Sequence, residues 1–288
     1  MGGVFTDKII VQRLTGFRWM AISSTEEDTL IYDNARVLVA VRNCIKELKK
    51  YYHGTKSATI PAFVCGQPHP RYFPYPTKFR KEGTEFHFAY RKSLENHPSS
   101  VTYLAEITEE TTDKTDAGVK VVVKFVTSYG KEVHEFLARE GWAPKLRYCS
   151  PLGKTRPPND STELLQSAPP GLHSDVMQMV VMDYVEARHK PPYDAHLQVK
   201  KVLTRLHNEG YVYGDLRGPN ILFDANDQVK FVDFDWCGRY DRGQTDGTYA
   251  RYPLRISNVP DMWPADAKPL TQIRPAHDLE MLKKLKWE

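Results

Sequence analysis

The stretch YVYGDLRGPNILFDANDQVKFVDFDWCG, residues 211–238, carries the residues that decide the fold. Asp215 and Asn220 lie five positions apart on one loop, and Asp233 follows the apolar strand VKFV. Phosphoryl transfer requires a carboxylate that orients the attacking hydroxyl and accepts its proton, together with oxygen ligands for Mg²⁺. One Asp and one Asn on the loop, with a second Asp after the next strand, supply that set of groups.

These residues lie in motifs that resemble the protein-kinase-like superfamily. DLRGPNIL resembles the kinase catalytic loop, and VDFDW lies where that family has its D-F-G turn. VVVKF resembles the strand whose lysine, here Lys124, grips the α- and β-phosphates of ATP. The resemblance implies a helical glutamate that orients Lys124. Glu132 is the first choice because it shares a helix face with Phe136, and Glu135 is the alternative.

Further motifs follow in the order of that family. MDYV resembles the hinge that binds adenine through its backbone, which makes Met182 the gatekeeper and places Asp183 and Val185 at the nucleotide. HDLEML resembles the helix whose aspartate, here Asp278, holds the catalytic loop. The combination of YGxEVHEFLA, GxAPxL, YGDLRxxN and VDFDW is most similar to the kinase-like proteins of basidiomycete fungi. Gly214, before the catalytic Asp, is also similar to the glycine of RIO-type, aminoglycoside and choline kinases.

The resemblance implies an ATP- and Mg²⁺-dependent phosphotransferase that moves the γ-phosphate to a hydroxyl of a protein Ser/Thr or a small molecule. Asp215 would deprotonate the acceptor, Asn220 and Asp233 would hold Mg²⁺, and Arg217 would steady the γ-phosphate. Asp235 is either a further metal ligand or part of a solvated turn. Structural alternatives stay open: Asp215 and Asn220 also suit Asx turns, and Arg217 suits a surface salt bridge.

Several departures from the family pattern favour a second hypothesis. The turn between the first two strands, RKSLENHPSS (91–100), lacks the glycines that let backbone amides approach phosphate. Tyr213 and Gly214 replace the usual His-Arg, so no arginine is present to pair with an activation-loop phosphate. Asp235 replaces the glycine of D-F-G. The alternative function is therefore a weak or inactive pseudokinase that acts as a protein-binding module.

The remaining sequence predicts an α+β protein with a kinase-like bilobal fold. Residues 1–79 form an N-terminal extension, 80–185 a β-rich lobe and 186–288 a short helical lobe. Helices are expected where apolar residues recur at helical spacing, and strands where β-branched and aromatic residues are frequent. The expected helices are 25–53, 129–140, 194–210 and 277–282, and the expected strands are 86–94, 101–108, 119–126, 145–152, 177–185 and 229–232. The segments 58–79, 109–118 and 153–175 are expected to be a linker and two loops.

Composition sets broader limits. The net charge of +4 over 288 residues is mild and scattered, which argues against a nucleic-acid partner. Cys44, Cys65, Cys149 and Cys237 form no CxxC pair and are expected to be reduced thiols, so a cytoplasmic or nuclear location is predicted. No apolar run reaches the roughly 18–20 residues of a transmembrane helix. MGGVFT matches the loose N-myristoylation pattern at Gly2. Residues 1–79 could also bind a partner protein.

Overall fold

A six-stranded antiparallel sheet carries one half of the structure, in the order β3-β4-β5-β6-β8-β7. The computed structural model describes residues 2–5, 9–12, 27–54, 76–94, 101–110, 116–152, 177–188, 190–243, 248–254, 256 and 262–287. The strands are β3 (Lys78–Lys81), β4 (Thr84–Ser93), β5 (Thr102–Glu110), β6 (Lys120–Val126), β7 (Leu146–Pro151) and β8 (Gln178–Asp183). Their alternating and β-branched side chains bury one face of the sheet, in a cluster that includes Phe88, Tyr103, Ile107, Val121, Val123, Phe125 and Val181.

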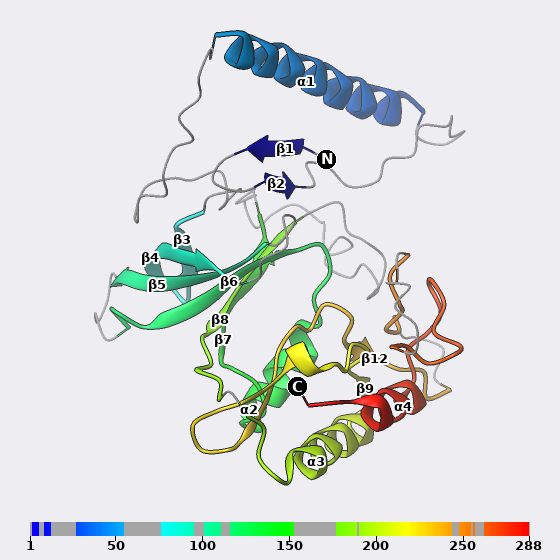
Figure 1. The fold of residues 1–288 in the computed structure, drawn as a ribbon. Coiled ribbons are helices and arrows are strands. Elements are labelled where there is room, and N and C mark those ends of the chain that lie inside the picture. Colours follow the sequence, from blue (N-terminus) through cyan, green and yellow to red (C-terminus); the bar gives the residue numbers. More distant parts are fainter. Residues whose placement is uncertain are drawn as a thin grey trace.

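Helices dominate the other half. They are α2 (Lys131–Arg139), α3 (Ala195–Asn208) and α4 (Pro275–Lys284). Figure 1 shows the sheet on one side and α3 and α4 on the other, with α2 lying between them. The inner faces of the three helices share one apolar core, which includes Val133, Phe136, Leu137, Val199, Val202, Leu203, Leu206, Met281 and Leu282. Because α2 contributes to this core, it ties the sheet to the helical half.

Short strands position the loop quoted above. β9 (Tyr211–Val212) pairs with β12 (Gly238–Arg239), and β10 (Ile221–Phe223) pairs with β11 (Val229–Phe231). A single 3-10 turn, Gly218–Asn220, leads into β10. The two antiparallel pairs hold residues 213–220 and 232–237 between them, so the polar residues of both segments meet at one place.

The N-terminal part of the chain contains α1 (Glu27–Gly54) and a hairpin of β1 (Gly2–Phe5) and β2 (Ile9–Gln12). Figure 1 shows α1 apart from the six-stranded sheet. Its apolar side chains at Ile31, Leu38 and Ile45 are exposed. The helix predicted for 25–53 is confirmed, and its side chains are not part of the core that surrounds the loop.

The structure bears out the α+β class and each helix and strand expected from the sequence. It adds β3, which lies in the segment expected to be a linker, and the predicted domain boundary at 79/80 falls inside this strand. Parts of the expected linker and loops, at 58–75, 111–115 and 153–175, and Cys65 lie outside the described residues. Among the described helices, none is both long and apolar enough to cross a bilayer. The described cysteines are free thiols.

Candidate functional site

One buried carboxylate, that of Asp278 in α4, fixes the backbone of the loop. Its Oδ2 accepts hydrogen bonds from Tyr213 N at 2.9 Å and His207 Nε2 at 2.9 Å, and its Oδ1 accepts one from Gly214 N at 2.8 Å. Asp278 is fully buried. A carboxylate in such a place is stable only when donors satisfy it, and here three donors do so. The role expected of Asp278 in holding this loop is therefore confirmed.

Gly214 lies at a point where a side chain does not fit. Its φ is +83°, in the left-handed region that L residues avoid. A Cβ at this position would lie 2.7 Å from Ile273 Cδ1 and 3.3 Å from the carbonyl oxygen of Trp236. Backbone conformation and packing both call for glycine directly before Asp215.

Replacing Gly214 with alanine is expected to destabilise the fold by about 1–3 kcal/mol, because it combines backbone strain with overpacking. Gly243→Ala is the matched control, since Gly243 also has φ +83° but a Cβ there would meet no atom within 4 Å. The difference between the two variants in urea unfolding isolates the clash with Ile273. Equal destabilisation of both would contradict a role for packing at Gly214.

Asp215 is buried, and one of its carboxylate oxygens accepts no hydrogen bond. Oδ2 accepts hydrogen bonds from Asn220 Nδ2 at 2.8 Å and Arg217 Nε at 3.2 Å. Arg217 Nε is also 3.0 Å from Oδ1 but is not aligned for a hydrogen bond there, so the buried Oδ1 accepts none. Burial raises the pKa of Asp215 to about 6, with Arg217 opposing the shift. This carboxylate is therefore desolvated, keeps one oxygen without a hydrogen bond and is more basic than an ordinary aspartate.

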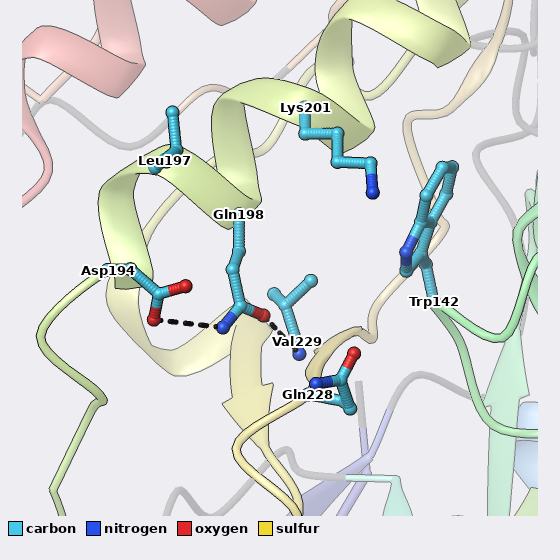
Figure 2. Close-up of a pocket in the computed structure, with 7 residues that line it drawn as sticks. All are labelled: Trp142, Asp194, Leu197, Gln198, Lys201, Gln228 and Val229. Atoms are coloured by element: carbon cyan, nitrogen blue, oxygen red, sulfur yellow. Dashed lines mark hydrogen bonds between the residues drawn. The ribbon is translucent and has the colours of Figure 1, made fainter.

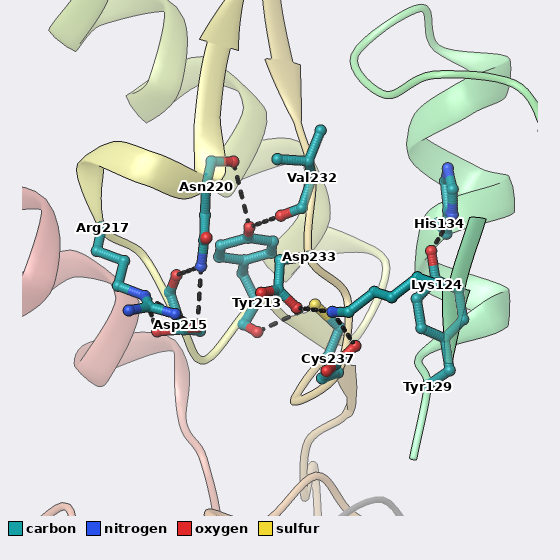
Figure 3. Close-up of polar contacts among 11 residues, drawn as sticks. Lys124, Tyr129, His134, Tyr213, Asp215, Arg217, Asn220, Val232, Asp233 and Cys237 are labelled. Atoms are coloured by element: carbon teal, nitrogen blue, oxygen red, sulfur yellow. Dashed lines mark hydrogen bonds and ion pairs between the residues drawn. The ribbon is translucent and has the colours of Figure 1, made fainter. Parts of the chain in front are cut away.

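Asn220 Nδ2 also donates to the backbone oxygen of Asp215 at 2.9 Å, which locks the amide in place. The Arg217 side chain pairs with Asp215 and is 41% exposed, so it lies between this carboxylate and solvent. Figure 3 shows Asp215, Arg217 and Asn220 on one side of Tyr213, and Asp233 and Lys124 on the other.

A second group of charges surrounds Lys124, which is 8% exposed in β6. Its Nζ lies 2.6 Å from Asp233 Oδ1 and 2.7 Å from Asp235 Oδ1. Burial alone would lower the pKa of Lys124, but the two carboxylates hold it above its ordinary value. Burial and the charge of Asp233 raise the pKa of Asp235 to about 7. Asp233 takes the left-handed φ of +65°, so the strained position in the DFD turn is its first residue and not Asp235.

The structure does not bring Glu132 to Lys124, contrary to the expectation from the sequence. Glu132 is 66% exposed and pairs with Arg239 at 3.1 Å. Glu135, the alternative, lies 3.8 Å from Lys131 on the same outer face. The inner face of α2 carries Val133, His134, Phe136 and Leu137 instead. The prediction is wrong in this structure because both glutamates lie on the solvent side of the helix.

The expected hinge residues lie at the end of β8. The Met182 side chain is buried with Val126 and Val180. Asp183 Oδ1 accepts a hydrogen bond from Arg147, and Arg147 also pairs with Asp116 at 2.7 Å. Val185 is half-buried, and its backbone N–H and C=O form no backbone hydrogen bond within the described residues.

An aromatic stack that the sequence pattern does not predict connects α2 with the loop. His134 stacks on Phe234 with ring centroids 4.3 Å apart, and Phe234 meets Tyr213 edge-on at 6.0 Å. The Tyr213 hydroxyl donates to the Val232 carbonyl, and Cys237 Sγ donates to the Tyr213 carbonyl at 3.0 Å. Cys237 is thus a packing residue, as expected. Phe234 and Tyr213 lie next to the aspartates in the sequence, which could have indicated that they pack at the site. Nothing in the sequence indicates that His134 of α2 stacks on Phe234.

A separate groove of about 310 Å³ lies where the start of α3 meets the β10–β11 hairpin. Figure 2 shows its lining residues, which are Trp142, Asp194, Leu197, Gln198, Lys201, Gln228 and Val229. Gln198 spans the groove wall by donating to Asp194 and accepting from Val229 N. The groove includes none of the residues predicted for the site, so it is not the place where the loop would do chemistry.

The comparisons with known proteins add no relative: no protein-family model matches the chain, and no curated protein matches it significantly.

Proposed function

We propose that this protein is an ATP- and Mg²⁺-dependent phosphotransferase with a kinase-like bilobal fold, which transfers the γ-phosphate to a hydroxyl group. The observation that carries the proposal is the unsatisfied Oδ1 of Asp215. A buried acceptor without a donor is costly, and a substrate hydroxyl would supply the missing donor. The raised pKa of Asp215 suits a group that must accept a proton near neutral pH.

The available ligand atoms fit magnesium. Asn220 offers its amide oxygen, and Asp233 offers carboxylate oxygens, one of which contacts Lys124. Within the described residues no three His, Cys, Asp or Glu side chains cluster as a ready metal site. Mg²⁺ commonly binds through one or two protein oxygens and completes its shell with water and phosphate oxygens, so two ligands suffice. When bound with ATP, the ion would neutralise the charge that develops on the phosphates.

The remaining steps, which are proton acceptance and the binding of ATP, would be carried out by side chains and backbone groups of the protein. Asp215 Oδ1 would accept the hydroxyl proton as the new bond to the γ-phosphorus forms and the bond to the bridging oxygen of ADP breaks. Lys124 would contact the α- and β-phosphates, and the hinge backbone at Asp183 and Val185 would hold adenine beside Met182. Arg217 must leave Asp215 when the acceptor arrives, and it would then reach the transferred phosphate.

Nucleotide binding tests the proposal directly. ATP with Mg²⁺ at 100 times its Kd is expected to stabilise the native state by about 2.7 kcal/mol, which raises Tm by about 4–5 °C in a protein of this size. The measurement is differential scanning fluorimetry with ATP and Mg²⁺, ADP and Mg²⁺, and Mg²⁺ alone. A Lys124→Met variant serves as the control that should respond less. No shift at millimolar nucleotide would contradict the proposal.

A kinase-like binding module is the second candidate, and one observation favours it. Lys124 pairs with both Asp233 and Asp235, and Arg217 pairs with Asp215, so each of these three carboxylates has a cationic partner without a ligand. A protein that uses the fold as a scaffold would need no more than this. Phosphate transfer from ³²P-labelled ATP to the protein itself, to generic proteins and to a metabolite panel separates the candidates and identifies the acceptor class.

A further inference from the structure

Lys124 requires a carboxylate partner that stays in place during nucleotide binding. Its side chain is buried in β6, where an unpaired ammonium group would be strongly unfavourable. Two carboxylates contact it, from Asp233 and Asp235, at 2.6 and 2.7 Å. If Asp233 binds Mg²⁺, its oxygens are shared with the metal. The other carboxylate must then hold Lys124.

Helix α2 is not arranged to take over that task. Its start is fixed by a hydrogen bond from Gly130 N to Phe234 O at 2.7 Å. A Cβ at position 130 would lie 2.6 Å from the Cys237 carbonyl oxygen, so the helix start and the turn after Asp235 are in close contact. His134 stacks on Phe234 with an interplanar angle of 8°. Rotating α2 to turn Glu132 inward would break the stack and expose the apolar inner face.

Asp235, and not Glu132, lies where it can hold Lys124. It follows Phe234, whose ring and backbone oxygen both contact α2, so its position is set by the same packing that fixes the helix. Resting on the proposed function, we propose that Asp235 is the positioning residue for Lys124, in place of a carboxylate from the helix, and that this leaves Asp233 available to Mg²⁺. Asp235 then acts on the nucleotide only through Lys124 and is not itself a metal ligand.

A double-mutant cycle tests this assignment in two arms. The first cycle combines Asp235→Asn with Lys124→Met. A second cycle combines Glu132→Gln, the competing partner, with Lys124→Met. Glu135→Gln removes the same charge from the surface of α2 and serves as the control. The first arm is urea unfolding of the nucleotide-free protein. Coupling is expected between Lys124 and Asp235 and not between Lys124 and Glu132. Coupling to Glu132 alone, or to neither, would overturn the assignment.

The second arm measures ADP and adenosine affinity by calorimetry in the presence of Mg²⁺. Asp235→Asn is expected to weaken ADP binding about tenfold and to leave adenosine binding unchanged, since adenosine has no phosphate for Lys124 to contact. In the Lys124→Met background the same substitution should have no further effect. A loss that persists there, or a higher Mg²⁺ requirement, would show that Asp235 binds the metal and would overturn the proposal.

The two arms also separate this inference from the proposed function. If the wild-type protein binds neither ADP nor ATP while Lys124 and Asp235 remain coupled in unfolding, the phosphotransferase proposal fails and the pairing is supported. If the protein binds ADP and the coupling is absent, the phosphotransferase proposal stands and the role of Asp235 is wrong.

Discussion

Replacing Asp215 with asparagine is expected to lower the rate of phosphate transfer by about 10²–10⁴-fold, the usual effect of losing a general base. The amide has nearly the same shape as the carboxylate, but it cannot accept the hydroxyl proton. Nucleotide affinity should change little, because Asp215 contacts Arg217 and Asn220 and not the lysine expected to bind the phosphates. The measurement is steady-state transfer from ATP to the best acceptor found, together with the Kd for ADP.

The Asp215→Asn variant is expected to be more stable than the wild type above pH 6. A lower transfer rate in this variant would then not be caused by unfolding. The native pKa of Asp215 is raised to about 6 from an ordinary value of 3.8, so the folded protein binds the proton more tightly than the unfolded chain does. The protonated Asp215 carboxyl therefore adds to the free energy of unfolding at low pH, and this contribution is lost as the pH rises from about 4 to 6. Asparagine has no charge to bury. Its higher Tm should appear at pH 7.5 and vanish near pH 4.

A wild-type rate of transfer in Asp215→Asn would rule out Asp215 as the base. A lower Tm for the variant at pH 7.5 would contradict a dominant cost of burial, because it would mean that the carboxylate contributes more through its contacts with Arg217 and Asn220 than it costs.

Removing the carboxylate of Asp278 with alanine is expected to destabilise the fold by about 3–5 kcal/mol, as for other buried charges that leave their partners unsatisfied. Three donors, at Tyr213 N, Gly214 N and His207 Nε2, would lose their acceptor at once. Urea unfolding followed by fluorescence measures the loss.

Glu280→Gln is the matched control for this change. Glu280 lies two residues further along α4, is 41% exposed and pairs with Lys284 at 2.8 Å. An exposed pair of this kind contributes little, so the control should unfold within about 0.5 kcal/mol of the wild type. An Asp278→Ala variant that matched the control would show that the loop does not depend on this carboxylate.

The sequence predicted those features that depend on local pattern. The helical spacing of α3 and the β-branched run around Lys124 were sufficient to locate these elements, because each buries one continuous apolar surface. The site was predictable where one loop carries several of its residues, as with Asp215, Arg217 and Asn220. β3 was missed because its KFRK sequence has little apolar character and obtains its stability from pairing with β4.

The partner of Lys124 could not be predicted in the same way. It depends on which face of α2 points inward, and both Glu132 and Glu135 suit a helix near the lysine. His134 and Phe234 decide that orientation by stacking, although they lie far apart in the sequence. Long-range packing of this kind leaves no periodic signal. The substitution of Asp235 for glycine was visible, but its link to the lysine required the structure.

The contact between Gly130 and Phe234 has a mechanical consequence. Only four residues, 127–130, connect β6 to α2, and the last of them is hydrogen-bonded to the turn that carries both aspartates. Lys124 and its two partners are therefore carried on segments that cannot slide independently. A hinge movement that opened the molecule between sheet and helices would have to bend elsewhere, and the segment between the end of β8 and α3 also connects the two halves. The charged centre would travel as one rigid piece, preassembled before any ligand arrives.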